Sequence, residues 1–133
     1  MKKNMEQANY LKAIVIGIGS FLTSILGVLA IPTVLMVASN VTDYITGLIA
    51  SKFREQDINS YRSMRGIFKK VGMWLLVIVG AILDVLLEYS LANLGIKIPF
   101  SFPVASIVEV WITCNEIISN LENIQDIGVN IPG

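Results

Sequence analysis

The sequence contains no histidine and only one cysteine, Cys114. Without histidine, acid–base catalysis by imidazole, a histidine-containing triad and histidine metal ligation are excluded. A single cysteine cannot form an internal disulfide bond, and Cys114 lies among apolar neighbours, where we expect a small buried residue rather than a reactive thiol. No nucleotide-binding loop, metal cluster or nucleophile–base pair is visible. We therefore expect a protein that is not an enzyme and that needs no metal or cofactor.

Charged residues are also scarce and unevenly distributed. They make up 15% of the 133 residues, whereas 54% are hydrophobic; an average soluble domain carries about 25% charged residues. No Asp, Glu, Lys or Arg occurs between Lys12 and Asp43, or between Lys70 and Asp84. Such runs are typical of helices that span a bilayer. The pattern predicts a single membrane domain over residues 1–133, and a net charge of zero argues against nucleic-acid binding.

Apolar runs and proline positions predict an all-α protein with four transmembrane helices, over residues 13–30, 32–51, 71–91 and 104–124. The first apolar stretch is nearly twice as long as one helix needs to cross a hydrocarbon core of about 30 Å. Pro32 lies near its middle and suits the first turn of a second helix, because proline is poorly tolerated in a helix interior. The alternative is a three-span protein with one long kinked helix, or a first hairpin that does not fully cross.

The segment from 52 to 70 is polar and basic, and we predict a cytoplasmic loop there. Its cations outnumber Glu55 and Asp57 and are Lys52, Arg54, Arg62, Arg65, Lys69 and Lys70. Short loops rich in Lys and Arg stay in the cytoplasm. The amino-terminal lysines should lie on the same side, which two crossings before the loop would allow. Both termini, including the tail over 125–133, are then predicted to be cytoplasmic.

Acidic residues within the predicted helices are costly in a bilayer. They are Asp43, Asp84, Glu88, Glu109 and Glu116. A charged group near the bilayer centre costs at least about 2.5–3.5 kcal/mol on insertion scales. No Lys or Arg lies within the same predicted helices to pair with them. We expect these groups to be protonated, hydrogen-bonded to another helix or exposed to water.

The polar residues share helix faces. On the fourth predicted helix, steps of three and four residues form one stripe, which consists of Ser106, Glu109, Thr113, Glu116, Asn120 and Asn123. Asp84 and Glu88 share a face with Gly80, and Asp43 shares one with Gly47. Either these groups form hydrogen bonds within one bundle, each worth about 0.6 kcal/mol, or they line water. We favour the first interpretation for any single residue and a hydrated or subunit-facing role for the whole stripe.

Four segments in register carry a family resemblance. They are residues 43–50 (DYITGLIA), Ser63 with residues 66–70 (GIFKK), Asp84, and residues 115–123 (NEIISNLEN) followed by Gly128 and residues 131–132. With these residues the chain resembles the phage-lysis and toxin-secretion holins, in particular bacteriophage holin family 4. The resemblance runs from about residue 40 to the end, and the first helix shares only its apolar character.

The resemblance implies a small protein of the bacterial cytoplasmic membrane that accumulates, assembles with copies of itself and opens a lesion. A cell-wall hydrolase, or in some relatives a large toxin, leaves the cell through it. Among the polar residues, we expect Asp43, Asp84, Glu109 and Glu116 to govern assembly or opening. A small ion- or proton-coupled transporter or channel subunit, using the same carboxylates, is the alternative, and a structural accessory of a membrane complex is a third.

Overall fold

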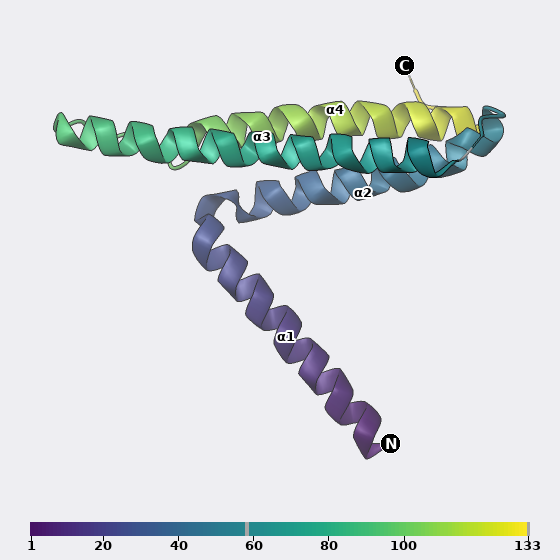
Figure 1. The fold of residues 1–133 in the computed structure, drawn as a ribbon, viewed down its shortest axis with the longest axis horizontal. Coiled ribbons are helices and arrows are strands. Elements are labelled where there is room, and N and C mark those ends of the chain that lie inside the picture. Colours follow the sequence, from purple (N-terminus) through teal and green to yellow (C-terminus); the bar gives the residue numbers. More distant parts are fainter. Residues whose placement is uncertain (58, 133) are drawn as a thin grey trace. The chain divides into compact units, whose positions relative to one another are not determined.

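The computed structural model describes residues 1–57 and 59–132 and shows a helical chain (Figure 1). The elements are α1 (Lys2–Leu26), the short 3-10 helix η1 (Gly27–Leu29), α2 (Ala30–Phe53), α3 (Ser60–Asn93) and α4 (Pro103–Ile127). No strand occurs in these two described ranges. The predicted all-α class is therefore confirmed.

The chain divides into two compact units, Met1–Ala30 and Ile31–Gly133. The first unit is α1 with η1, and the Thr23 hydroxyl donates a hydrogen bond of 2.7 Å to the Gly19 carbonyl within it. The second unit is a bundle of α2, α3 and α4. In this bundle α2 and α4 run in the same direction and α3 runs antiparallel to both (Figure 1). The candidate site lies in the second unit.

The break between the first two helices lies a few residues earlier than predicted. Gly27, which follows the last residue of α1, has a positive φ of +53°, which glycine adopts without the steric cost of a Cβ. Pro32 then falls in the first turn of α2, where its missing N–H costs no hydrogen bond. The helices predicted over 13–30 and 32–51 correspond to helices over 2–26 and 30–53.

The predicted basic loop over residues 52–70 is wrong in extent, because most of it is helical. α3 begins at Ser60 rather than at residue 71, and the Asn59 side chain caps it by accepting a hydrogen bond of 2.8 Å from the Arg62 N–H. Lys and Arg are good helix formers, so the charges in this segment do not interrupt the helix. With 34 residues, α3 is about 51 Å long.

Two helical segments in the described part of the chain are long and apolar enough to cross a membrane, Gly27–Phe53 and Ser60–Asn93. The outward faces of α3 are apolar and exposed, including Leu75, Leu76, Ile78, Val79, Ile82, Leu83 and Leu86. A soluble monomer rarely exposes so much apolar surface, whereas lipid tails accept it. These features support a membrane protein, and the four crossings stay a prediction.

The interior of the second unit is unusually polar. Its buried apolar residues are Met36, Ala50, Val77, Ala105 and Ile112, and its buried polar residues are Asn40, Asp84, Glu109, Glu116, Asn120 and Asn123. The hydrophobic effect supplies no driving force between helices in lipid, so small residues and polar contacts hold such bundles together. α3 and α4 are the most closely packed helices of the bundle.

Candidate functional site

The polar stripe of α4 faces the inside of the bundle. Glu109 is completely buried, and Glu116, Asn120 and Asn123 are at most 8% exposed. Ser106 and Thr113, the other members, are half-buried. Within one subunit the stripe is therefore an interhelical surface, and its hydrated or subunit-facing role stays a prediction. A hydrated role would require α2 to move away from α4.

Side-chain hydrogen bonds connect α2 to this stripe. The Asn120 amide donates to the Ser39 carbonyl at 3.1 Å, and its oxygen accepts from the Thr46 hydroxyl at 3.2 Å. The Asn123 amide donates to the Asp43 carboxylate and to the Thr46 oxygen, both at 3.0 Å. Interhelical hydrogen bonds in membranes are worth about 0.6 kcal/mol each. Individually weak contacts therefore hold α2 against α4, and they can be exchanged.

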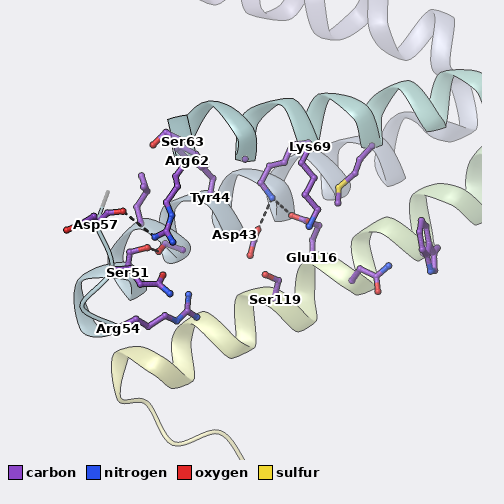
Figure 2. A pocket seen from close by; sticks show the side chains of 18 residues that line it. Asp43, Tyr44, Ser51, Arg54, Asp57, Arg62, Ser63, Lys69, Glu116 and Ser119 are labelled. Atoms are coloured by element: carbon purple, nitrogen blue, oxygen red, sulfur yellow. Dashed lines mark hydrogen bonds and ion pairs between the residues drawn. The ribbon is translucent and has the colours of Figure 1, made fainter. Parts of the chain in front are cut away.

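Lys70 joins all three helices of the bundle. From α3, its ammonium donates to Asp43 on α2 at 2.8 Å and to Glu116 on α4 at 2.5 Å (Figure 2). The side chains of these three residues are between 6% and 16% exposed. The expectation that the membrane carboxylates have no cationic partner is wrong for this pair, because α3 starts early enough to carry Lys70 on a buried face.

Asp84 is satisfied without a cation. It is 4% exposed, and its two oxygens accept hydrogen bonds of 2.8 Å from the backbone N–H groups of Val104 and Ala105. These N–H groups belong to the first turn of α4, which has no partner for them within the helix. A carboxylate at this position is also favoured by the helix dipole. Asp84 of α3 therefore caps the N-terminus of α4.

Two buried groups are only partly satisfied. The Thr33 hydroxyl of α2 donates to Glu109 Oε1, and Glu109 Oε2 has no hydrogen-bond partner among the described residues. The Asn40 oxygen accepts from the Trp74 indole N–H at 2.6 Å, and its Nδ2 likewise has no partner in that part of the chain. Thr33, Asn40 and Trp74 were not among the predicted site residues. An asparagine in an apolar helix was the available signal, since such residues commonly bond across helices.

The other predicted residues lie as follows. Glu88 is exposed, one turn beyond Asp84 on α3. A Cβ at Gly47 would lie 3.6 Å from the Asn123 amide nitrogen, so this glycine leaves room for that side chain. Cys114 is exposed, and the expectation of a buried thiol is wrong, because it lies outside the stripe that α4 turns inward.

The predicted basic residues separate into two groups. Lys70 is half-buried in the bundle, whereas the others are exposed and are Lys52, Arg54, Arg62, Arg65 and Lys69. Arg54 nevertheless bonds across to the end of α4, where Asp126 accepts from its Nε at 2.5 Å and Asn123 from its Nη2 at 3.0 Å. The end of α2 therefore lies beside the end of α4.

We refer to the hydrogen bonds and ion pairs that connect α2, Lys70 of α3 and the polar stripe of α4 as the polar seam. The polar seam consists of Thr33, Ser39, Asp43, Thr46, Lys70, Glu109, Glu116, Asn120 and Asn123. The described residues hold no group of three or more His, Cys, Asp or Glu side chains suited to a metal ion. The side chains of the polar seam can form hydrogen bonds and ion pairs either with another helix or with water.

Comparison with known proteins agrees with the sequence segments described above. The model of the bacteriophage holin family matches residues 20–133. A Clostridium perfringens protein described as "Uncharacterized 14.9 kDa protein in nagH 3'region" is 29% identical over 124 residues, which cover 93% of this chain and 86% of that protein. No solved structure matches this chain. The match to the family model confirms the resemblance and extends it toward the N-terminus.

Proposed function

This chain belongs to the bacteriophage holin family, and on that premise we propose that it assembles with copies of itself in the bacterial cytoplasmic membrane and forms a lesion that releases an endolysin or a toxin. The process involves no catalysis. The observation that carries the proposal is the polar seam, which lies inside a bundle whose outer faces are apolar.

The physical basis of this proposal is that polar side chains can exchange hydrogen-bond and ion-pair partners within a subunit for partners in a neighbouring subunit. In one subunit, α2 covers the polar face of α4 through hydrogen bonds and through Lys70. Polar groups in a membrane must face another polar surface or water, because lipid cannot satisfy them. A neighbouring subunit offers the same groups, so bonds within a subunit can be replaced by bonds between subunits at little net cost. Accumulation of copies then favours assemblies in which polar seams face a shared aqueous opening.

We propose four crossings with both termini in the cytoplasm. The antiparallel order of α2, α3 and α4 and the bond between Arg54 and Asp126 support placing the end of α4 on the side of the basic segment. The lysines at 2, 3 and 12 belong on that side if α1 also crosses. Lys97, in the connection between α3 and α4, then faces outward.

Inducible expression in a bacterium tests the function. Expression of this chain with a cell-wall hydrolase should give abrupt lysis after a delay, and expression of the chain alone should collapse the membrane potential and release folded cytoplasmic proteins. The hydrolase expressed alone to the same level is the control and should leave the cells intact. A chain that inserts at high copy number, is not toxic and releases nothing would be a structural accessory, which would contradict the proposal.

A transporter or channel subunit is the second candidate. It is favoured by Glu109, which is fully buried and has one carboxyl oxygen without a partner among the described residues, because ionisable residues inside a membrane often mark ion pathways or proton relays. This function predicts saturable ion or proton flux in vesicles that stay impermeable to folded proteins. Release of an enclosed fluorescent protein from the same vesicles would exclude it.

A further inference from the structure

A cavity of about 630 Å³ lies between α2, α3 and α4 at the basic end of the bundle (Figure 2). Its volume is in the range of sites that bind small molecules. Four cations line it, Arg54, Arg62, Lys69 and Lys70. If this end faces the cytoplasm, as the charge pattern predicts, the cavity lies near the level of the lipid headgroups.

Three carboxylates also line the cavity, Asp43, Asp57 and Glu116, and of these three only Asp43 and Glu116 form ion pairs with its cations among the described residues. Lys70 is neutralised by Asp43 and Glu116, and Arg54 is bound by Asp126. The Arg62 guanidinium donates to a backbone carbonyl, that of Asp57, at 3.4 Å, and to no other group of the described residues. Lys69 takes part in none of the hydrogen bonds or ion pairs of the described residues. The lining therefore presents two cations, one of them a guanidinium, that form no ion pair with a carboxylate of the described residues, Asp57 included.

Along one face of α3, the residues that line the cavity change from charged to apolar. Arg62, Gly66, Lys69 and Met73 follow at helical spacing and all line the cavity. A Cβ at Gly66 would meet no atom within 4 Å, so this glycine leaves open space between the two cations rather than allowing another helix to pack. Arg62 and Met73 are separated by about 16 Å of helix. Trp111 adds to the apolar part of the lining.

We propose that this cavity binds the phosphate of an anionic phospholipid, with Arg62 and Lys69 holding the phosphate and Met73 and Trp111 contacting the acyl chain. The guanidinium matches phosphate oxygens in geometry and charge. Basic pockets between transmembrane helices on the cytoplasmic side recognise anionic headgroups in this way. The binding does not depend on lesion formation, so it can be measured separately from lysis.

Lipid titration of the purified full chain tests the proposal. The delipidated protein in detergent is titrated with phosphatidylglycerol or with phosphatidylcholine of the same acyl chains, and bound lipid is counted by native mass spectrometry. We expect preferential binding of phosphatidylglycerol. The double variant Arg62→Gln with Lys69→Gln should bind it roughly tenfold more weakly or worse, because charge-assisted hydrogen bonds are lost.

The matched control is Lys52→Gln with Arg65→Gln. It removes the same charge from exposed positions that do not line the cavity, and it should change the affinity by less than about twofold, since exposed charges interact weakly through solvent. Circular dichroism and gel filtration establish that all variants are folded. Equal weakening in the test and control pairs, or equal binding of both lipids, would overturn the proposal.

A second variant, Gly66→Leu, reduces the volume of the cavity and leaves the charge of its lining unchanged. Gly66→Leu fills the open part of the cavity and should abolish preferential binding of phosphatidylglycerol, while helix formation improves. Competition with inorganic phosphate distinguishes a site for the phosphate of a lipid from a site for free phosphate. Displacement of phosphatidylglycerol by inorganic phosphate at equal concentration, with binding unaffected by Gly66→Leu, would indicate a site for free phosphate and would overturn the lipid assignment.

Discussion

Gly80 of α3 lies directly against the backbone of Ala105 of α4. A Cβ built at Gly80 would come within 3.2 Å of the Ala105 Cα and within 3.3 Å of its nitrogen. The same Ala105 nitrogen donates its hydrogen bond to Asp84, one turn further along α3. A small residue and an adjacent cap therefore fix where α4 begins.

Replacing Gly80 by Val should separate α3 from α4. The added side chain meets backbone atoms, which cannot rotate away, so we expect a loss of about 1–3 kcal/mol in the free energy of unfolding. Unfolding of the purified protein in mixed detergent and SDS micelles measures this loss. Gly72→Val is the control on the same helix, because a Cβ at Gly72 meets nothing within 4 Å. Equal destabilisation by both variants would contradict the close approach.

Asp84→Asn should weaken the cap of α4 and alter the time of lysis. The amide keeps one acceptor oxygen but directs a donor group at the second backbone N–H, so a cost of about 1 kcal/mol in the free energy of unfolding is expected. The control is Glu88→Gln, which removes an exposed carboxylate from the same helix. Identical stability and lysis timing in both variants would show that Asp84 does not act as the cap.

Glu116→Gln should leave membrane insertion intact and advance the time of lysis. Lys70 then retains one carboxylate partner, Asp43, so the contact of α4 with the rest of the bundle is weakened and subunits can exchange partners at a lower copy number. Membrane fractionation with immunoblotting measures insertion, and culture turbidity measures timing. Glu122→Gln, an exposed carboxylate of the same helix, is the control and should lyse at the normal time. If neither Glu116→Gln nor Asp84→Asn changes the timing, the acidic residues do not govern opening.

Local patterns predicted much of this fold and part of the site. Helical spacing placed Glu109, Glu116 and Asn120 on one face, and that face is buried. Pro32 indicated the first turn of α2, because its chemistry is local. The apolar character of α2 and α3 likewise identified two segments able to span a membrane.

Contacts between helices could not be predicted in this way. Lys70 was assigned to a loop because a run of charges was interpreted as loop-like, although such residues form helices well. Its pairing with Asp43 and Glu116 depends on how α3 is rotated against two other helices. The capping by Asp84 likewise depends on where α4 begins in space, and no spacing within α3 encodes that position.

Cysteine labelling should establish the number of crossings. Cys114 is exposed, so the Cys114→Ser background is required. In intact cells, an impermeant thiol reagent should label Ile31→Cys and Lys97→Cys, which lie at the proposed outward turns, and should label Gln56→Cys only after permeabilisation. Labelling of Ile31→Cys only after permeabilisation would place the turn between α1 and α2 in the cytoplasm, and the four-span topology would be wrong.

Glu109→Leu should leave the subunit at least as stable as before and yet impair lysis. Glu109 is completely buried, and only one of its oxygens has a partner among the described residues. Replacing such a group with an apolar residue of similar size is often neutral or stabilising. We therefore expect the isolated subunit to unfold at the same or a higher SDS fraction than the original protein.

Lysis by Glu109→Leu should nevertheless be lost or strongly delayed, because leucine cannot face water in an assembled lesion. The volume-conserving variant Ile112→Leu, at a buried apolar position of the same helix, should change neither stability nor timing appreciably. A carboxyl group that served only to hold the bundle would be dispensable once leucine had replaced it without loss of stability. Normal lysis timing in a stable Glu109→Leu protein would therefore assign Glu109 to packing and remove it from the residues that govern opening.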